Sequence, residues 1–123
     1  MRKREHELQC QCVKWFRLKY RKYYYVLFAV PNGMRSNRIT GAVCKAEGML
    51  AGVADLILLK SNRHYGALCI EMKTKSGKQQ ESQKLWQQEA ENAGNKYVVC
   101  RSLDEFMKEV NDYMNDIDYV EMD

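Results

Sequence analysis

The sequence contains no run of about 18 consecutive apolar residues, the length that a membrane-spanning helix requires. The basic residues of its first stretch, MRKREHELQ, are not followed by an apolar segment, so we expect no secretory signal there. Internal repeats, low-complexity segments and RNA-recognition motifs are also missing. With 123 residues, 46% of them hydrophobic, the chain is expected to form one compact domain with a substantial core.

The five cysteines are an odd number and include no CxxC pair. Most of them lie in apolar stretches, which is typical of reduced, buried thiols in a cytoplasmic protein. A zinc site is disfavoured, because Cys10 and Cys12 would point in widely different directions on a helix. The formal net charge of +4 is concentrated in the first third of the chain and is compatible with nucleic-acid binding. Many soluble domains are equally basic, so the charge alone does not decide the function.

The most informative stretch is GVADLILLKSNRHYGALCIEMK, which predicts two strands at residues 52–60 and 66–73. Both are rich in Leu, Ile, Val, Ala and Cys, as in strands that are buried on both faces. If the polar connection of residues 61–65 centres on Arg63, Asp55 lies opposite Glu71 and Lys73 lies opposite Val53. Side chains alternate along a strand, so the two acids and Lys73 emerge on one face.

Directly opposed side chains have their Cβ atoms about 5 Å apart, and like charges there repel each other. Two carboxylates in an apolar hairpin therefore require a cation, and converging oxygen atoms suit a hard divalent ion such as Mg²⁺. We interpret Asp55 and Glu71 as a metal site rather than a structural ion pair with Lys73. A shift of one residue in the register would send one acid to the wrong face.

Residues 5–16 are predicted to form a helix with one apolar stripe, made of Leu8, Cys12, Trp15 and Phe16. Glu5 begins this inward face, whereas Glu7 belongs to the opposite one. The inward acid either needs a partner at the site or serves only the positive end of the helix dipole.

The basic and tyrosine-rich stretch RLKYRKYYY that follows has two readings. It is either a surface for a sugar-phosphate backbone with some stacking, or a helix end that leads into a strand at residues 24–30. A Pro-Asn-Gly turn at residues 31–33 ends this strand. Gly41 and Gly48 bracket a short predicted helix at residues 42–47, and this region offers Arg35, Arg38 and Lys45 for phosphate contacts.

After the hairpin, a basic loop at residues 74–78 carries Lys75 and Lys78 as further candidates for DNA binding. A helix is predicted at residues 79–93, with Gly94 as its stop and with Leu85, Trp86, Ala90 and Ala93 facing inward. Gln83 lies on its first turns, near the end of the strand that carries Lys73. A strand follows at residues 96–101, and the sequence SLDE opens a last helix as a capping box, with Leu103, Phe106, Val110 and Met114 inward.

This order of elements predicts an α/β fold with a mixed central sheet and helices on both faces. Residues 66–101 form a strand–helix–strand unit, which favours a parallel pair of strands. We expect residues 1–123 to be a single domain, with residues 115–123 as a frayed acidic tail.

The pattern D-x15-E-x-K, preceded by a helical Glu and followed by a helical Gln, resembles the PD-(D/E)xK nucleases and more narrowly the VRR-NUC family. The matching segments cover almost the whole chain: EHELQ, PNG, KAEGMLAGVADL, IEMK, the pair Ser82-Gln83, and AGNKYVVCRSLDEF. One departure is Ala54, because the family usually has proline before the metal-binding Asp. Alanine allows the same backbone conformation at a modest entropic cost.

The resemblance implies a restriction-endonuclease-like core and Mg²⁺-dependent cleavage of phosphodiester bonds, with Mn²⁺ as a substitute. Asp55, Glu71 and the backbone carbonyl of Met72 would bind the metal, and Glu5 would reach it through water or complete a second site. Lys73 would position the attacking water and stabilise charge, and Gln83 would orient Lys73 or the phosphate. The resemblance also implies a homodimer, in a bacterial cell or a phage-infected host, that cuts branched DNA such as four-way junctions.

Two other functions remain open. The acids and Lys73 could form a structural network in a non-catalytic DNA-binding or assembly module, although an uncompensated buried carboxylate is costly. Alternatively, the enzyme could act on single strands, flaps or RNA. Metal-dependent cutting of different substrates distinguishes these functions.

Overall fold

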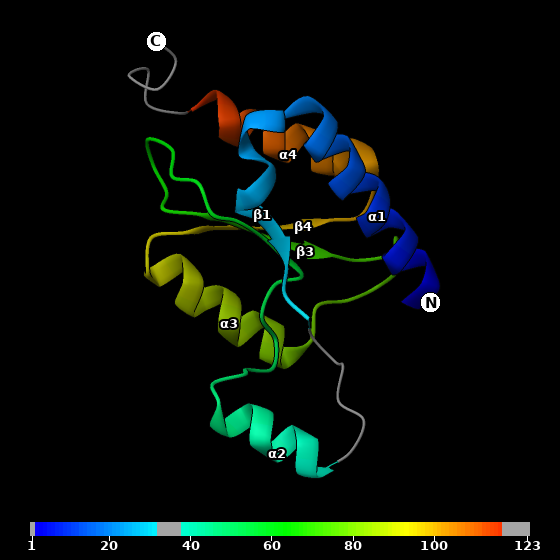
Figure 1. Cartoon of the computed structure of the whole chain (residues 1–123), viewed down its shortest axis with the longest axis vertical. Coiled ribbons are helices and arrows are strands. Elements are labelled where there is room, and N and C mark those ends of the chain that lie inside the picture. The colour runs from blue at the N-terminus through cyan, green and yellow to red at the C-terminus, as the bar shows by residue number, and fades with distance from the viewer. Residues whose placement is uncertain (1, 32–37, 117–123) are drawn as a thin grey trace.

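The structure, a computed structural model, describes residues 2–31 and 38–116 and has three layers (Figure 1). Helices α1 and α4 cover one face of a four-stranded sheet, α3 covers the other face, and α2 stands apart beyond α3. The bounds are α1 Arg2–Lys19, η1 Arg21–Val26, β1 Leu27–Ala29, α2 Arg38–Ala46, β2 Leu56–Leu58, β3 Leu68–Met72, α3 Glu81–Asn92, β4 Lys96–Cys100 and α4 Leu103–Asn115. No helix within the described ranges is both long enough and apolar enough to cross a membrane.

The strands follow the order β1-β2-β3-β4 across the sheet. The β1–β2 and β2–β3 pairs are antiparallel, and β3–β4 is parallel. The prediction of a mixed sheet with helices on both faces is therefore confirmed. Every residue of β3, LCIEM, is buried, including Glu71, and its apolar residues are typical of a strand covered on both faces.

The main core lies between the sheet and the α1/α4 layer. Cys12 and Phe16 of α1 and Phe106 and Val110 of α4 are fully buried there, which confirms the predicted inward faces. The sequence reasoning missed Tyr113, which is only 1% exposed and donates a hydrogen bond from its hydroxyl to the carbonyl of Lys60 (2.6 Å).

The predicted strand at residues 24–30 is mostly wrong. Residues 21–26 form the 3₁₀ helix η1, and β1 keeps only three residues. The amide of Tyr23 donates to the carbonyl of Tyr20 (2.9 Å), and the ring of Tyr23 packs against the core. This tight turn redirects the chain from α1 into the sheet, so the stretch RLKYRKYYY does contain a helix end that leads into a short strand. Tyr24 and Tyr25 are exposed, and the other reading of this stretch, a surface for a sugar-phosphate backbone, stays a prediction.

The helix predicted at residues 42–47 exists but begins earlier, because α2 starts at Arg38 and includes Gly41. The helix ends at Ala46, and Gly48 follows with a φ of 107°, a conformation that favours glycine. Most of the predicted turn at residues 31–33 lies outside the described residues. Arg35, a candidate for a phosphate contact, also lies outside them.

The predicted inward face of α3 is wrong at two of its residues. Leu85 is 61% exposed and Ala93 is also exposed, whereas Trp86 and Ala90 pack against the sheet as predicted. A helix advances about 100° per residue, so Leu85 cannot share the face of Trp86. Gly94 follows the helix with a φ of 96°, as expected of its stop.

The predicted cap of α4 is confirmed in part. The Ser102 hydroxyl accepts the amide of Glu105 (3.1 Å), but the Glu105 carboxylate accepts the amide of Arg101 (2.6 Å) rather than that of Ser102. The helix ends at Asn115, so most of the expected acidic tail, residues 117–123, lies outside the described residues.

Candidate functional site

The register of the β2–β3 hairpin brings the two strand acids together. Leu56 pairs with Ile70, Ile57 with Cys69, and Leu58 with Leu68. The same register, extended by one residue, places Asp55 opposite Glu71, as the turn centred on Arg63 predicts. Asp55 Oδ2 accepts the backbone amide of Met72 (2.7 Å), which anchors this carboxylate to the end of β3.

Glu71 is the most enclosed charged side chain of the site, with an exposed fraction of 2%. Its Oε2 accepts a hydrogen bond from Gln83 Nε2 (2.8 Å) and lies 3.7 Å from Lys73 Nζ. Its Oε1 lies 3.5 Å from the donating hydroxyl of Tyr97. Lys73 is itself only 7% exposed, so the structure joins the buried Glu71 and Lys73 and the half-buried Gln83 in one polar cluster.

Burial, the largest cause, and the neighbouring carboxylate of Asp55 together raise the pKa of Glu71 to about 8. Lys73 acts in the opposite direction, and Glu5 contributes a smaller increase. Without an added cation, Glu71 therefore holds its proton at neutral pH. Two opposed carboxylates, one of them reluctant to ionise, form the kind of oxygen-donor pair that a divalent cation relieves. Asp55 and Glu71 thus fit Mg²⁺ chemically.

Gln83 is held in place from its own helix. Its Oε1 accepts the backbone amide of Gln80 (2.8 Å) at the start of α3, which leaves its Nε2 to donate to Glu71. The side-chain amide of Gln83 is therefore held at both its oxygen and its nitrogen. The structure therefore places Gln83 against the acid, next to the lysine that we expected it to orient.

Glu5 lies half-buried on α1, near enough to influence Glu71, whereas Glu7 is exposed as predicted. In the described part of the chain, no three His, Cys, Asp or Glu side chains gather closely enough to hold a metal ion. Glu5 therefore does not complete a three-acid cluster, and its predicted contact through water stays a prediction.

The candidates for DNA binding are not all at one place. Lys75 and Lys78 are exposed on the loop that follows the strand of Glu71. Lys45 is exposed on α2, the helix that begins with Arg38 and stands apart from the sheet (Figure 1).

Sequence reasoning missed Tyr97 and Arg101. Tyr97 sits on β4 opposite Cys69, two residues from Glu71, and its hydroxyl also accepts Gln79 Nε2 (3.2 Å). Arg101 Nη1 donates to the carbonyls of Thr74 (2.9 Å) and Gly77 (2.5 Å), so it fixes the loop after Lys73. Neither role is visible without the parallel register of β3 and β4.

Sequence reasoning also missed that Gly52 helps to position the site. Its φ of 86° favours glycine, and a Cβ there would overlap the backbone carbonyl of Ser82. This close approach fixes the segment before Asp55 against the α3 turn that carries Gln83. The signal for this role in the sequence was a glycine three residues before Asp55, a candidate metal ligand.

Comparisons with known proteins give matches over most of the chain. The VRR-NUC domain model matches residues 1–104. A solved structure described as a VRR_NUC domain protein superposes with a TM-score of 0.81 at 23% sequence identity, over 93% of this chain and 90% of the other. At this identity the structural match supports the fold alone. A search of curated proteins gives no significant match.

Proposed function

The chain belongs to the VRR-NUC family of nucleases, and on this premise we propose that it is a Mg²⁺-dependent DNA endonuclease. The observation that carries the proposal is the convergence of Asp55, Glu71, Lys73 and Gln83 at the end of one hairpin. A purely structural network would gain little from burying two acids with one lysine, because desolvation offsets most of their attraction.

In this proposal Asp55 and Glu71 hold Mg²⁺ or Mn²⁺, together with the backbone carbonyl of Met72, and Glu5 contributes through water. The bound ion supplies polarisation of the phosphate and a lower pKa for bound water. Proton loss from Glu71 accompanies metal binding, because a ligand carboxylate must be ionised.

Lys73 acts on the phosphate from the buried side of the cluster, and Gln83 acts through Glu71. Lys73 supplies a fixed positive charge where negative charge develops on the phosphate, and its burial strengthens that interaction. Gln83, held by the Gln80 amide, keeps Glu71 Oε2 oriented and positions Lys73 through it. Both groups are ordered before substrate arrives, so the reaction requires little rearrangement.

We further propose that the enzyme is a homodimer that cuts branched DNA such as four-way junctions. Two sites related by a two-fold axis suit a symmetric junction. The last helix, one candidate for the contact between subunits, uses Phe106, Val110 and Met114 within the core. Residues 15–25 are the other candidate for this contact, and their most exposed large hydrophobic side chain is Tyr25 (91%). Light scattering measures the predicted mass directly.

The test is cleavage of plasmid, flap and four-way-junction DNA with Mg²⁺, Mn²⁺ or EDTA. We expect Asp55→Ala and Lys73→Ala to lose metal-dependent cleavage while they still bind DNA. Lys84→Ala is the matched control, because Lys84 is exposed on α3. If both site variants cut like the unmodified protein, the residue assignment is wrong. If the unmodified protein binds these substrates and never cuts them, the chain is a binding module.

A further inference from the structure

An open groove of about 790 Å³ runs between α1, η1 and β1 and is called here the α1–β1 groove. It is outside the carboxylate cluster described above. One wall is formed by α1 and η1, and the other is the backbone and side chains of β1, the edge strand of the sheet. The residues that matter for its chemistry are Lys14, Arg17, Arg21, Tyr24 and Phe28.

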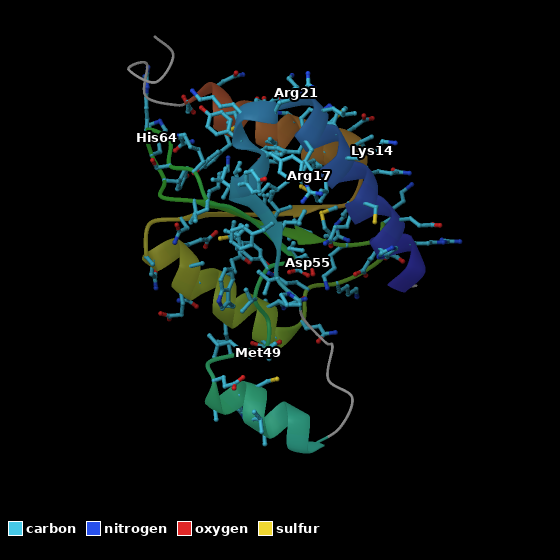
Figure 2. All side chains as sticks on the ribbon, in the orientation of Figure 1. Lys14, Arg17, Arg21, Met49, Asp55 and His64 are labelled. Atoms are coloured by element: carbon cyan, nitrogen blue, oxygen red, sulfur yellow. The ribbon has the colours of Figure 1, made fainter. Side chains whose placement is uncertain are left out.

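The groove is cationic. Lys14, Arg17 and Arg21 are all exposed, and their spacing of three and four residues suits one side of a helix and its continuation (Figure 2). No acidic residue lines the groove, and none of the three cations forms an ion pair with an acidic side chain among residues 4–31 and 42–116. Their charge is therefore available to a ligand.

The groove also presents aromatic rings. Tyr24 is 43% exposed and Phe28 is 41% exposed, so a ligand in the groove can contact both rings. The guanidinium carbon of Arg17 lies over the Tyr24 ring, 4.5 Å from its centroid, so this contact holds a cation and an exposed aromatic ring together. This combination suits a ligand that presents phosphates and unpaired bases side by side.

One end of the groove adjoins the carboxylate cluster. The lining residue His6 directly follows Glu5 on α1, and the lining residue Ala29 precedes Val30, whose amide donates to the Asp55 carbonyl (2.9 Å). Figure 2 shows Asp55 near the lower end of β1, with Lys14, Arg17 and Arg21 above it. A polynucleotide bound at Asp55 could therefore continue directly into the groove.

We propose that the α1–β1 groove binds a single-stranded DNA segment that extends from the scissile phosphate at the proposed metal site of Asp55 and Glu71. This inference rests on the nuclease function proposed above. An unpaired strand exposes both phosphates for the cations and base faces for the rings, whereas the paired bases of a duplex cannot stack on Tyr24 or Phe28. A second copy of the chain is disfavoured as the occupant, because an isologous contact would place the same uncompensated cations against each other.

The experiment measures binding of a fluorescent oligothymidine in EDTA, so that cleavage does not interfere. The variant Lys14→Glu/Arg17→Glu is expected to bind at least about tenfold more weakly, with a salt dependence reduced by about 0.7 for each lost phosphate contact. Tyr24→Ala is expected to lose about tenfold through stacking. The matched control Arg63→Glu/Lys84→Glu makes the same charge change at exposed positions outside the groove and should bind like the unmodified protein.

Photo-crosslinking gives a readout that needs no substitution in the groove. An oligonucleotide with a photoreactive pyrimidine should crosslink to peptides containing Tyr24 or Phe28. Crosslinks confined to other surfaces, equal losses in groove and control variants, or a groove variant whose only change is its oligomeric mass would each overturn the inference.

The inference can fail separately from the nuclease function. If the protein cuts DNA with Mg²⁺ and the groove variants cut and bind as well as the control, only the groove assignment is wrong. If no metal-dependent cleavage is found, oligothymidine binding and crosslinking still test the groove directly.

Discussion

The carboxylate cluster and the α1–β1 groove contrast in almost every physical property. At the cluster, Glu71 and Lys73 are 2% and 7% exposed, and Glu71 accepts hydrogen bonds from two neighbouring elements. In the groove, Lys14, Arg17 and Arg21 are exposed cations on a helix surface. The cluster is thus fixed before any ligand binds, whereas the groove can adapt to one.

This difference has an energetic consequence. Burying two ionised acids beside each other is costly, and at the cluster this cost is expressed as the raised pKa of Glu71. Exposed cations cost little in water and contribute mainly to association. Substitutions in the cluster should therefore change both the reaction and stability, whereas substitutions in the exposed surroundings should change DNA affinity alone.

The largest expected effect is on the reaction rate of Asp55→Asn. The asparagine oxygen can still accept the Met72 amide, but the charge that the metal requires is gone. We expect single-turnover cleavage of a junction to fall at least about 10²–10³-fold, while the melting temperature in EDTA does not fall. Asp104→Asn, in the exposed first turn of α4, is the control. Unchanged cleavage by Asp55→Asn would remove this acid from the reaction.

Gly52→Ala and Gly48→Ala separate backbone strain from close packing. Both glycines have positive φ, so each substitution should cost about 1–2 kcal/mol. Only the Cβ at position 52 meets the Ser82 backbone, which adds about 1–3 kcal/mol and displaces Gln83. Urea denaturation should show the larger loss for Gly52→Ala, together with slower cleavage. Equal losses of stability in the two variants would mean that α3 moves away from the added Cβ without cost.

The raised pKa of Glu71 predicts how stability depends on pH when no metal is present. Between pH 4.5 and about 8 the folded protein holds a proton that the unfolded chain has lost. Stability from this group is therefore full below pH 4.5 and is lost as the pH rises through about 8. Glu71→Gln should remove this dependence and stabilise the protein at pH 9 by at least about 1 kcal/mol.

Thermal melting in EDTA across this pH range is the measurement. Glu81→Gln, on the exposed first turn of α3, is the control and should keep the pH dependence of the unmodified protein. Addition of Mg²⁺ should reduce the pH dependence as well, because a bound cation favours the ionised carboxylate. A flat profile for the unmodified protein would contradict the predicted protonation of Glu71.

Arg101→Lys tests whether the loop after Lys73 must be held. Lysine cannot reproduce the forked donation to the carbonyls of Thr74 and Gly77. We expect amide exchange in residues 74–78 to accelerate about tenfold, the effect of losing one such bond, and cleavage to fall a few-fold. Lys75→Ala should leave exchange unchanged, because its side chain is exposed. Unaltered exchange in Arg101→Lys would show that the loop is held by other contacts.

The smallest expected effect on the fold is that of Lys75→Ala/Lys78→Ala. Both side chains are exposed, so melting should shift little, while affinity for duplex DNA should fall and its salt dependence should decrease by about 0.9 per lost contact. A filter or fluorescence titration at several salt concentrations provides the measurement. A salt dependence equal to that of the unmodified protein would exclude these lysines from the DNA contact.

The sequence was a sound guide where the chemistry is local and repetitive. The apolar stripe of α1 predicted Cys12 and Phe16 in the core, and the short polar connection at Arg63 predicted the Asp55–Glu71 pair. It failed at η1, where tyrosines favour a strand by composition but the chain has to turn between helix and sheet. It also failed for Leu85, an apolar residue that the orientation of α3 leaves exposed.

By itself, the sequence determined the two acids, the lysine, and the hairpin that places Asp55 opposite Glu71. Strand alternation and the turn between the strands are set by neighbouring residues, so they can be predicted from the sequence. Only the tertiary structure decided what surrounds Glu71. The sequence placed Gln83 near the end of the strand that carries Lys73, but its hydrogen bond to Glu71 depends on how α3 packs against the sheet. Tyr97 reaches Glu71 from the parallel strand β4, 26 residues further along the chain. The burial that raises the pKa of Glu71, and the groove that α1 and β1 enclose, depend on how the layers pack against each other, so no local pattern encodes them.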